Sequence, residues 1–195
     1  TSDEVVATLV QYTKKLGKTP IVVKDAPGFV VNRIIGPYLN EAVYLLLEGV
    51  TPTRMDSVME KFGMPMGPAT LLDEVGLDVA SKVSHVLFQA FGERMKPPSA
   101  LDSVVKEGRL GKKSGKGIYL HSEGKRTEDT ELLEKIGVKA EKEISDQEIQ
   151  KRLTYVMVNE AARIIDEGLV RDVSDIDVGM IFGTGFAPFR GGLLG

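Results

Sequence analysis

The sequence predicts a mainly α-helical fold with an internally duplicated unit, preceded by a short α/β segment. Three observations support this prediction. Apolar residues recur at helical spacing over most of the chain from residue 29 onward. Only two short segments have the composition of strands. A pattern of residues around Arg33 recurs 119 positions later, around Arg152.

The N-terminal segment predicts one helix followed by one strand. Over residues 2–16, Val5 and Leu9 share an apolar face, acidic residues come first and lysines last, which suits the helix dipole. Gly17 ends this helix, and residues 19–24 form a β-branched run that predicts a strand. A lone strand leaves backbone groups unpaired, so this pair indicates the end of an α/β domain separated from its sheet. The chain opens without Met and both ends look cut, so we expect a fragment of a longer protein.

The rest of the chain predicts helices joined by turns. Thr53 is expected to cap the second of these helices, and Ser145 to begin the long one with a capping box. Residues 117–120 predict the second strand, and the basic, glycine-rich residues 108–117 predict a loop. The polar residues 122–131 predict a mobile segment. The predicted helices are 30–47, 53–62, 69–75, 77–92, 99–107, 145–167 and a last one from Ser174 or Asp175.

The repeated pattern is a long helix, a Glu-Gly stop, a short helix and a Gly…Pro turn. Arg33 matches Arg152, and Glu41 matches Glu160. Two copies make a duplicated unit, and we expect them to pack against each other about a pseudo-two-fold axis. Glu41 and Glu160 are interpreted as structural partners across that axis.

Asn32 is the leading candidate for a residue that contacts a substrate. It lies where a Pro-Gly turn leads into the long helix, and an amide that both donates and accepts suits a carbonyl or hydroxyl substrate. The matching position in the second copy is Lys151, so the scaffold was copied without this side chain. A surface Asn beside a packing kink is the structural alternative.

A second candidate is the loop GKKSGKG. Lys112, Lys113 and Lys116 beside flexible glycines could meet phosphates, although their spacing is not that of a Walker A loop. A solvated basic hairpin is the alternative.

Composition excludes several classes of function. The chain has no Cys, hence no disulfide or thiolate metal site, and its two histidines, His85 and His121, lack partners at metal-ligand spacing. A net charge of −3 does not draw the surface to nucleic acid. The apolar runs are too short to span a bilayer, and the N-terminus lacks the features of a secretory leader. We therefore expect no metal, no nucleic-acid partner, no membrane span and no secretion.

Three separated segments carry a family resemblance. They read KDAPGFVVNRIIGPYLNEA, MPMGPATLLDEVGLDV and GRLGKKSGKGIYL. In these segments the chain resembles the C-terminal part of L-3-hydroxyacyl-CoA dehydrogenase. The second copy, which ends FGTGFAPFRGG, resembles the long form in the α subunit of fatty-acid oxidation complexes.

The resemblance implies a duplicated helical domain of the 6-phosphogluconate dehydrogenase-like type, placed after a Rossmann domain that binds NAD. Residues 1–25 are then the remnant of that dinucleotide-binding domain. Residues 26–121 are the first helical domain, and residues 122–195 are a truncated repeat.

The resemblance also implies a reaction, the oxidation of the 3-hydroxyl of an acyl-CoA with hydride passing to NAD. The family's catalytic His, Glu and Ser would all precede Thr1, so we expect the isolated chain to be inactive. Asn32 is assigned as a catalytic residue and Lys113 as a cofactor-binding residue on the NAD side of the cleft. Met59, Met64 and Met66 either line an acyl path or belong to the core.

The implied partners are an acyl-CoA substrate, the missing Rossmann domain, a thiolase subunit of the oxidation complex and a second copy in a homodimer. The implied location is the bacterial cytoplasm, or else the mitochondrial matrix or peroxisome. The alternative function is a non-catalytic helical dimerisation or interaction module, in which Asn32 is incidental. A third interpretation is the helical domain of another β-hydroxyacid dehydrogenase, against which the motifs MPMGP and GKKSGKG argue.

Overall fold

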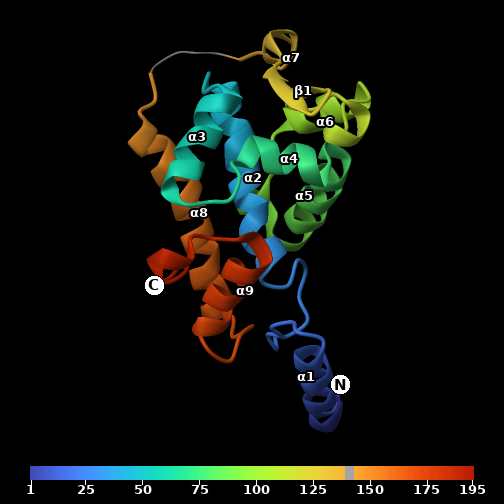
Figure 1. Cartoon of the computed structure of the whole chain (residues 1–195), viewed down its shortest axis with the longest axis vertical. Coiled ribbons are helices and arrows are strands. Elements are labelled where there is room, and N and C mark those ends of the chain that lie inside the picture. Colours follow the sequence, from blue (N-terminus) through green and yellow to red (C-terminus); the bar gives the residue numbers. More distant parts are fainter. Residues whose placement is uncertain (139–142) are drawn as a thin grey trace.

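The computed structural model describes residues 1–138 and 143–195, and it confirms the predicted mainly helical fold, with 63% of residues helical (Figure 1). The helices are α1 (Asp3–Lys15), α2 (Val31–Leu47), α3 (Pro52–Phe62), α4 (Pro68–Val75), α5 (Leu77–Phe91), α6 (Ser99–Lys106), α7 (Thr130–Lys135), α8 (Asp146–Asp166) and α9 (Ser174–Thr184). The strands are β1 (Tyr119–Ser122) and β2 (Lys125–Glu128), and short 3₁₀ segments lie at Gly92–Met95, Lys112–Ser114 and Pro188–Arg190.

The predicted capping residue is confirmed for α8 and wrong for α3. Ser145 accepts a hydrogen bond from the backbone N of Glu148 at 3.2 Å, as a helix N-cap does. In α3 the cap is Thr51 instead of Thr53, and its hydroxyl accepts from the backbone N of Arg54 at 3.3 Å. The earlier start follows from Pro52, because proline fits the first helical position, where an amide would have no helical partner.

The strand predicted over residues 19–24 is wrong. In the described part of the chain, Val23 alone forms a β-bridge there, to Val170, and the backbone N of Lys24 donates to Leu169 O at 2.9 Å. A β-branched run favours extended backbone, but a strand also needs a neighbour to accept its hydrogen bonds. Helix α1 buries none of its residues and stands apart from the other helices in Figure 1.

Residues 122–131, which the sequence predicts to be a polar and mobile segment, contain regular secondary structure. They form the antiparallel partner of β1 and the start of α7, with Tyr119 paired to Glu128 and Ser122 to Lys125. Glu123 and Gly124 both have positive φ, which two-residue hairpin turns require. Strand β2 reads KRTE and is mostly exposed, so it lacks the apolar alternation by which strands are recognised in a sequence.

The two copies pack on each other through equivalent helices. Helix α2 packs along α8, α3 packs on α8, and α9 packs on α2. Figure 1 shows α2 near the centre of the molecule, with α8 and α9 beside it. Helix α8 repeats α2, and α9 repeats α3. The contact of α3 with α8 therefore corresponds to the contact of α9 with α2, as pseudo-two-fold packing requires.

A buried ion-pair cluster joins the start of α2 to the end of α8. The Arg33 side chain is fully buried, with its Nε 2.7 Å from Glu160 Oε1. Its two Nη atoms donate to the Glu167 carboxylate at 2.6 and 2.8 Å. Arg33 also lies over the ring of Phe91, 4.2 Å from the centroid.

The same cluster recurs at the other end of the helix pair. Arg152 Nε donates to Glu41 at 2.6 Å, and its Nη atoms donate to Glu48 at 2.6 and 2.7 Å. Arg152 is the counterpart of Arg33, and the two glutamates are the counterparts of those that Arg33 binds. The predicted pseudo-two-fold packing and the structural role of Glu41 and Glu160 are therefore confirmed.

Candidate active-site groove

A left-handed turn sets the start of α2. Gly28 and Phe29 both have positive φ, and the backbone N of Arg33 donates to Gly28 O at 3.2 Å. A Cβ added at Gly28 would lie 2.9 Å from Leu87 Cδ2, so glycine also lets this turn approach α5 closely. The turn thereby fixes the first residues of α2 against α5.

Asn32 lies in the first turn of α2, and its side chain is exposed. No side-chain hydrogen bond of Asn32 is found among residues 1–138 and 143–195. Its amide is therefore free to bind a ligand through both its donor and its acceptor. Its neighbour Arg33 points instead into the ion-pair cluster with α8. Arg33 therefore joins two helices, whereas Asn32 faces solvent.

Asn32 lines a groove of about 430 Å³. The walls come from α2, α4, α5, the loop between α3 and α4, and the end of α9. The lining is mainly apolar and includes Val31, Ile35, Leu39, Met64, Met66 and Val79. A groove of this size with few polar groups is typical of a small-molecule site.

The other two polar side chains of the lining are already satisfied. Ser84 Oγ donates to Asn40 Oδ1 at 3.1 Å, and Thr184 Oγ1 donates to Met180 O at 2.6 Å. Within the described residues, the amide of Asn32 is thus the one unpartnered polar side-chain group in the lining. The groove consequently offers a single polar contact beside a surface suited to an alkyl chain.

The three candidate methionines divide between groove and core. Met64 and Met66 line the groove, whereas Met59 is fully buried in the core. The core alternative is therefore confirmed for Met59, whereas Met64 and Met66 border the groove.

Asp73 explains the glycines of the basic loop. Its buried carboxylate accepts from the backbone N atoms of Ile118 and Tyr119 at 2.7 and 2.9 Å and lies 2.7 Å from His121 Nε2. A Cβ at Gly117 would lie 2.0 Å from Asp73 Oδ1, and one at Gly111 would lie 2.4 Å from its carbonyl oxygen. Packing on Asp73 accounts for both glycines without a phosphate ligand.

Two of the three lysines of this loop, Lys112 and Lys113, are paired with acidic residues of α4 and α5. Lys113 Nζ lies 2.5 Å from Asp78 Oδ1, and its hydrogen bond lowers the pKa of the Asp78 carboxyl. Lys112 Nζ lies 2.6 Å from Glu74 Oε1. Lys113 is outside the groove lining, but Asp78 lies next to Val79, which forms part of the wall.

The histidines form carboxylate pairs and no metal centre. His85 Nε2 lies 3.0 Å from Asp102 Oδ2, Ser81 Oγ donates to Asp102 Oδ1, and His121 pairs with the buried Asp73. In the part of the chain that the structure describes, no group of three or more His, Cys, Asp or Glu could hold a metal ion.

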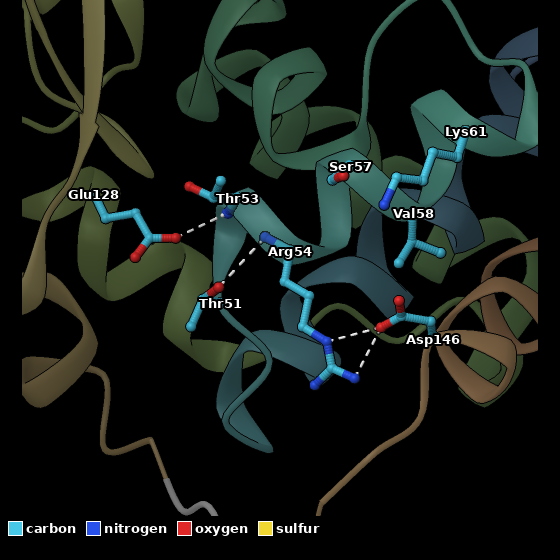
Figure 2. Close-up of a pocket in the computed structure, with 8 residues that line it drawn as sticks. All are labelled: Thr51, Thr53, Arg54, Ser57, Val58, Lys61, Glu128 and Asp146. Atoms are coloured by element: carbon cyan, nitrogen blue, oxygen red, sulfur yellow. Dashed lines mark hydrogen bonds and ion pairs between the residues drawn. The ribbon is translucent and has the colours of Figure 1, made fainter.

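A second hollow, of about 450 Å³, lies over the start of α3 (Figure 2). Some of its polar groups bind one another, since the backbone N of Thr53 donates to Glu128 at 3.0 Å and Arg54 Nε donates to Asp146 at 2.8 Å. Neither Asn32 nor Lys113 lines this hollow, and the guanidinium of Arg54 already has a carboxylate partner. The apolar groove beside Asn32 is therefore the better candidate.

Comparison with protein families matches residues 28–121 to the C-terminal domain of 3-hydroxyacyl-CoA dehydrogenase. Residues 28–121 belong to this domain family. The matched range contains Asn32, most of the groove and the loop with Lys113.

Curated relatives extend the likeness over the whole chain. The chain is 46% identical over 192 residues to the fatty acid oxidation complex subunit alpha of Vibrio parahaemolyticus, covering 98% of this chain and 27% of the relative. The identity to the same subunit of Vibrio cholerae is also 46%, over 193 residues and with the same coverage. The chain therefore spans about a quarter of the length of the curated relatives it matches.

Solved structures agree with this assignment. The crystal structure of 3-hydroxybutyryl-CoA dehydrogenase from Escherichia coli has a TM-score of 0.76 at 25% identity, covering 97% of this chain and 57% of that one. The dehydrogenase part of multifunctional enzyme 1 from C. elegans has a TM-score of 0.69 at 30% identity, covering 93% and 42%. The predicted family and helical fold are confirmed.

Proposed function

We propose that this chain is the substrate-side helical part of an NAD-dependent L-3-hydroxyacyl-CoA dehydrogenase of fatty-acid β-oxidation. The observation that carries the proposal is the unpartnered amide of Asn32 beside an apolar groove, within a domain of this family. An alkyl chain fits the apolar walls, and the amide fits the oxygen at the substrate's third carbon.

Asn32 is proposed as a catalytic residue that donates a hydrogen bond from Nδ2 to this oxygen. A fixed donor at the point where charge develops stabilises the transition state more than the bound substrate. The apolar walls would hold the acyl chain and keep water from it, because burial of methylene groups is favourable.

The described residues do not by themselves fit an NAD site. Lys112 and Lys113 are neutralised by Glu74 and Asp78, and the flanking glycines, Gly111 and Gly117, are explained by packing on Asp73. The cofactor is therefore proposed to bind mainly to residues upstream of Thr1, with Lys113 at the edge of its site.

A comparison of two chains tests the proposal. NADH oxidation with acetoacetyl-CoA would be measured for these 195 residues and for a chain extended upstream through the dinucleotide-binding domain. We expect turnover from the extended chain alone, since the base and most cofactor contacts lie in the added part. Comparable turnover by the shorter chain would contradict the proposal that the base and most cofactor contacts lie in the upstream domain. Inactivity of both would favour the interaction-module alternative.

Replacing Lys113 by methionine is expected to raise the KM for NADH about threefold in the extended chain, because an exposed charge contributes below about 1 kcal/mol. The KM for acetoacetyl-CoA should stay unchanged. Lys112→Met is the matched control, since Lys112 has the same kind of exposed carboxylate partner. Equal effects of the two substitutions would show that Lys113 has no special part in cofactor binding.

The remaining partners follow from the relatives, which are subunits of a fatty acid oxidation complex in bacteria. We propose a thiolase subunit as partner and the cytoplasm as location.

No helix in the described residues is long and apolar enough to cross a membrane. The interaction-module alternative is supported by exposed aromatic side chains on the second repeat, namely Tyr155, Phe182 and Phe189. A homodimer that buries these side chains is a proposal based on the same observation.

A further inference from the structure

We propose that the second repeat sets the acyl chain length of the substrate, through Gly183 at the end of α9. This inference rests on the proposed function, because it takes the groove beside Asn32 as the acyl site. Gly183 and Thr184 lie in the groove lining together with residues of α2, α4 and α5 from the first repeat. The groove is therefore complete only when the two repeats are docked.

Gly183 packs closely on Val31 of α2, and both residues line the groove. It is exposed, and a Cβ built there would lie 3.3 Å from both Cγ atoms of Val31, which is closer than most Cβ contacts. Its φ is not in the left-handed region, so the backbone conformation does not require glycine. A larger side chain at this position would therefore press on Val31 and change the width of the groove, without straining the backbone of α9.

The end of α9, next to Gly183, packs closely on the loop between α3 and α4. Gly185 ends α9 in a left-handed conformation, and a Cβ there would lie 2.8 Å from Pro65. Pro65 stands between Met64 and Met66, which line the same groove. The end of α9 therefore abuts the methionine loop, so both repeats border the acyl chain on this side.

The second repeat supplies this wall without repeating the groove itself. Gly36 lines the groove and lets α5 approach α2, since a Cβ there would lie 2.4 Å from Leu87 Cδ1. Its counterpart is Tyr155, which is 60% exposed, and the counterpart of Asn32 is Lys151. The described chain therefore holds one such groove, built by both copies.

Gly183→Leu in the extended chain tests the proposal with a short and a long substrate. We expect kcat/KM for 3-ketodecanoyl-CoA to fall about tenfold, equivalent to about 1.4 kcal/mol, and that for acetoacetyl-CoA to change less than about twofold. Gly183→Ala should give a smaller loss in the same direction, and it keeps the test valid if the leucine variant does not fold. Phe182→Leu is the control, because Phe182 is the neighbouring residue, is 71% exposed and lies outside the lining.

Calorimetric binding of decanoyl-CoA and butyryl-CoA to the same proteins separates this inference from the proposed function. If wild type binds decanoyl-CoA but does not turn over, and the Gly183 variants weaken decanoyl-CoA selectively, the inference stands and the proposed function fails. If turnover is normal and the chain-length profile of the variants is unchanged, or both substrates lose equally, the inference is overturned. Absence of both binding and turnover in wild type overturns both.

Discussion

Replacing Asn32 by alanine in the upstream-extended chain is expected to lower kcat for acetoacetyl-CoA by about 10²- to 10³-fold, the range for loss of one fixed donor to a developing charge. The amide has no partner in the described protein, so its removal leaves no buried group unsatisfied. Stability should therefore change little, and the loss should appear in catalysis. Steady-state kinetics and a thermal melt would measure the two effects.

Lys151→Ala provides a matched control for this substitution. Lys151 occupies the equivalent position in the second copy, is exposed and lies outside the groove. We expect its replacement to leave both kcat and KM unchanged. Sedimentation of Asn32→Ala adds a second readout, because loss of association with intact turnover would favour the interaction module over the enzyme.

Replacing Arg33 by methionine is expected to reduce the free energy of unfolding by about 3 kcal/mol, as breaking a buried ion pair does when one charge stays behind. Methionine fills much of the volume but leaves Glu160 buried, with an exposed fraction of only 4%. Arg94 remains 3.3 Å from Glu160, which places the loss at the lower end of the usual range. Urea denaturation of the 195-residue chain would measure it.

Arg152→Met is the control that the duplication itself supplies. Arg152 makes the same three contacts, but its side chain is 24% exposed, so water can replace them. We expect its replacement to lower the free energy of unfolding by about 1 kcal/mol or less. Equal losses at the two positions would contradict the argument from burial. Adding Glu160→Gln to Arg33→Met should recover part of the stability, because it removes the unpaired charge.

The difference between wild type and Arg33→Met should also depend on pH. Hydrogen bonding to Arg33 lowers the pKa of Glu167 below its ordinary value of 4.5. A carboxyl with a lowered pKa in the folded state stabilises the protein above its unfolded pKa, and this stabilisation is lost as pH falls through the folded pKa. The difference in unfolding free energy should therefore be largest at neutral pH and shrink below about pH 4.5. A constant difference down to pH 3 would show that the ion pair is not its source.

Local patterns in the sequence determined the helices, the duplication and the position of Asn32. Apolar spacing and caps such as Ser145 act within a few residues, so the chain alone fixes them. The structural role of Glu41 and Glu160 could be inferred because they occupy matching positions of the repeat, whereas their pairing with Arg152 and Arg33 is seen only in the structure. The family could be inferred from motifs that keep their order along the chain.

Tertiary packing decided what depends on a distant partner. Residues 19–24 have strand composition but no neighbouring strand among the described residues, whereas the charged β2 pairs because β1 lies beside it. The glycines around Lys113 are set by Asp73, about forty positions away, and the lysine itself is paired with Asp78. Gly183 shows no local signal, because its place in the groove arises from the docking of the second repeat on α2. Spacing along a helix encodes which face is buried, but the walls of a groove come from several elements and exist only once these have packed.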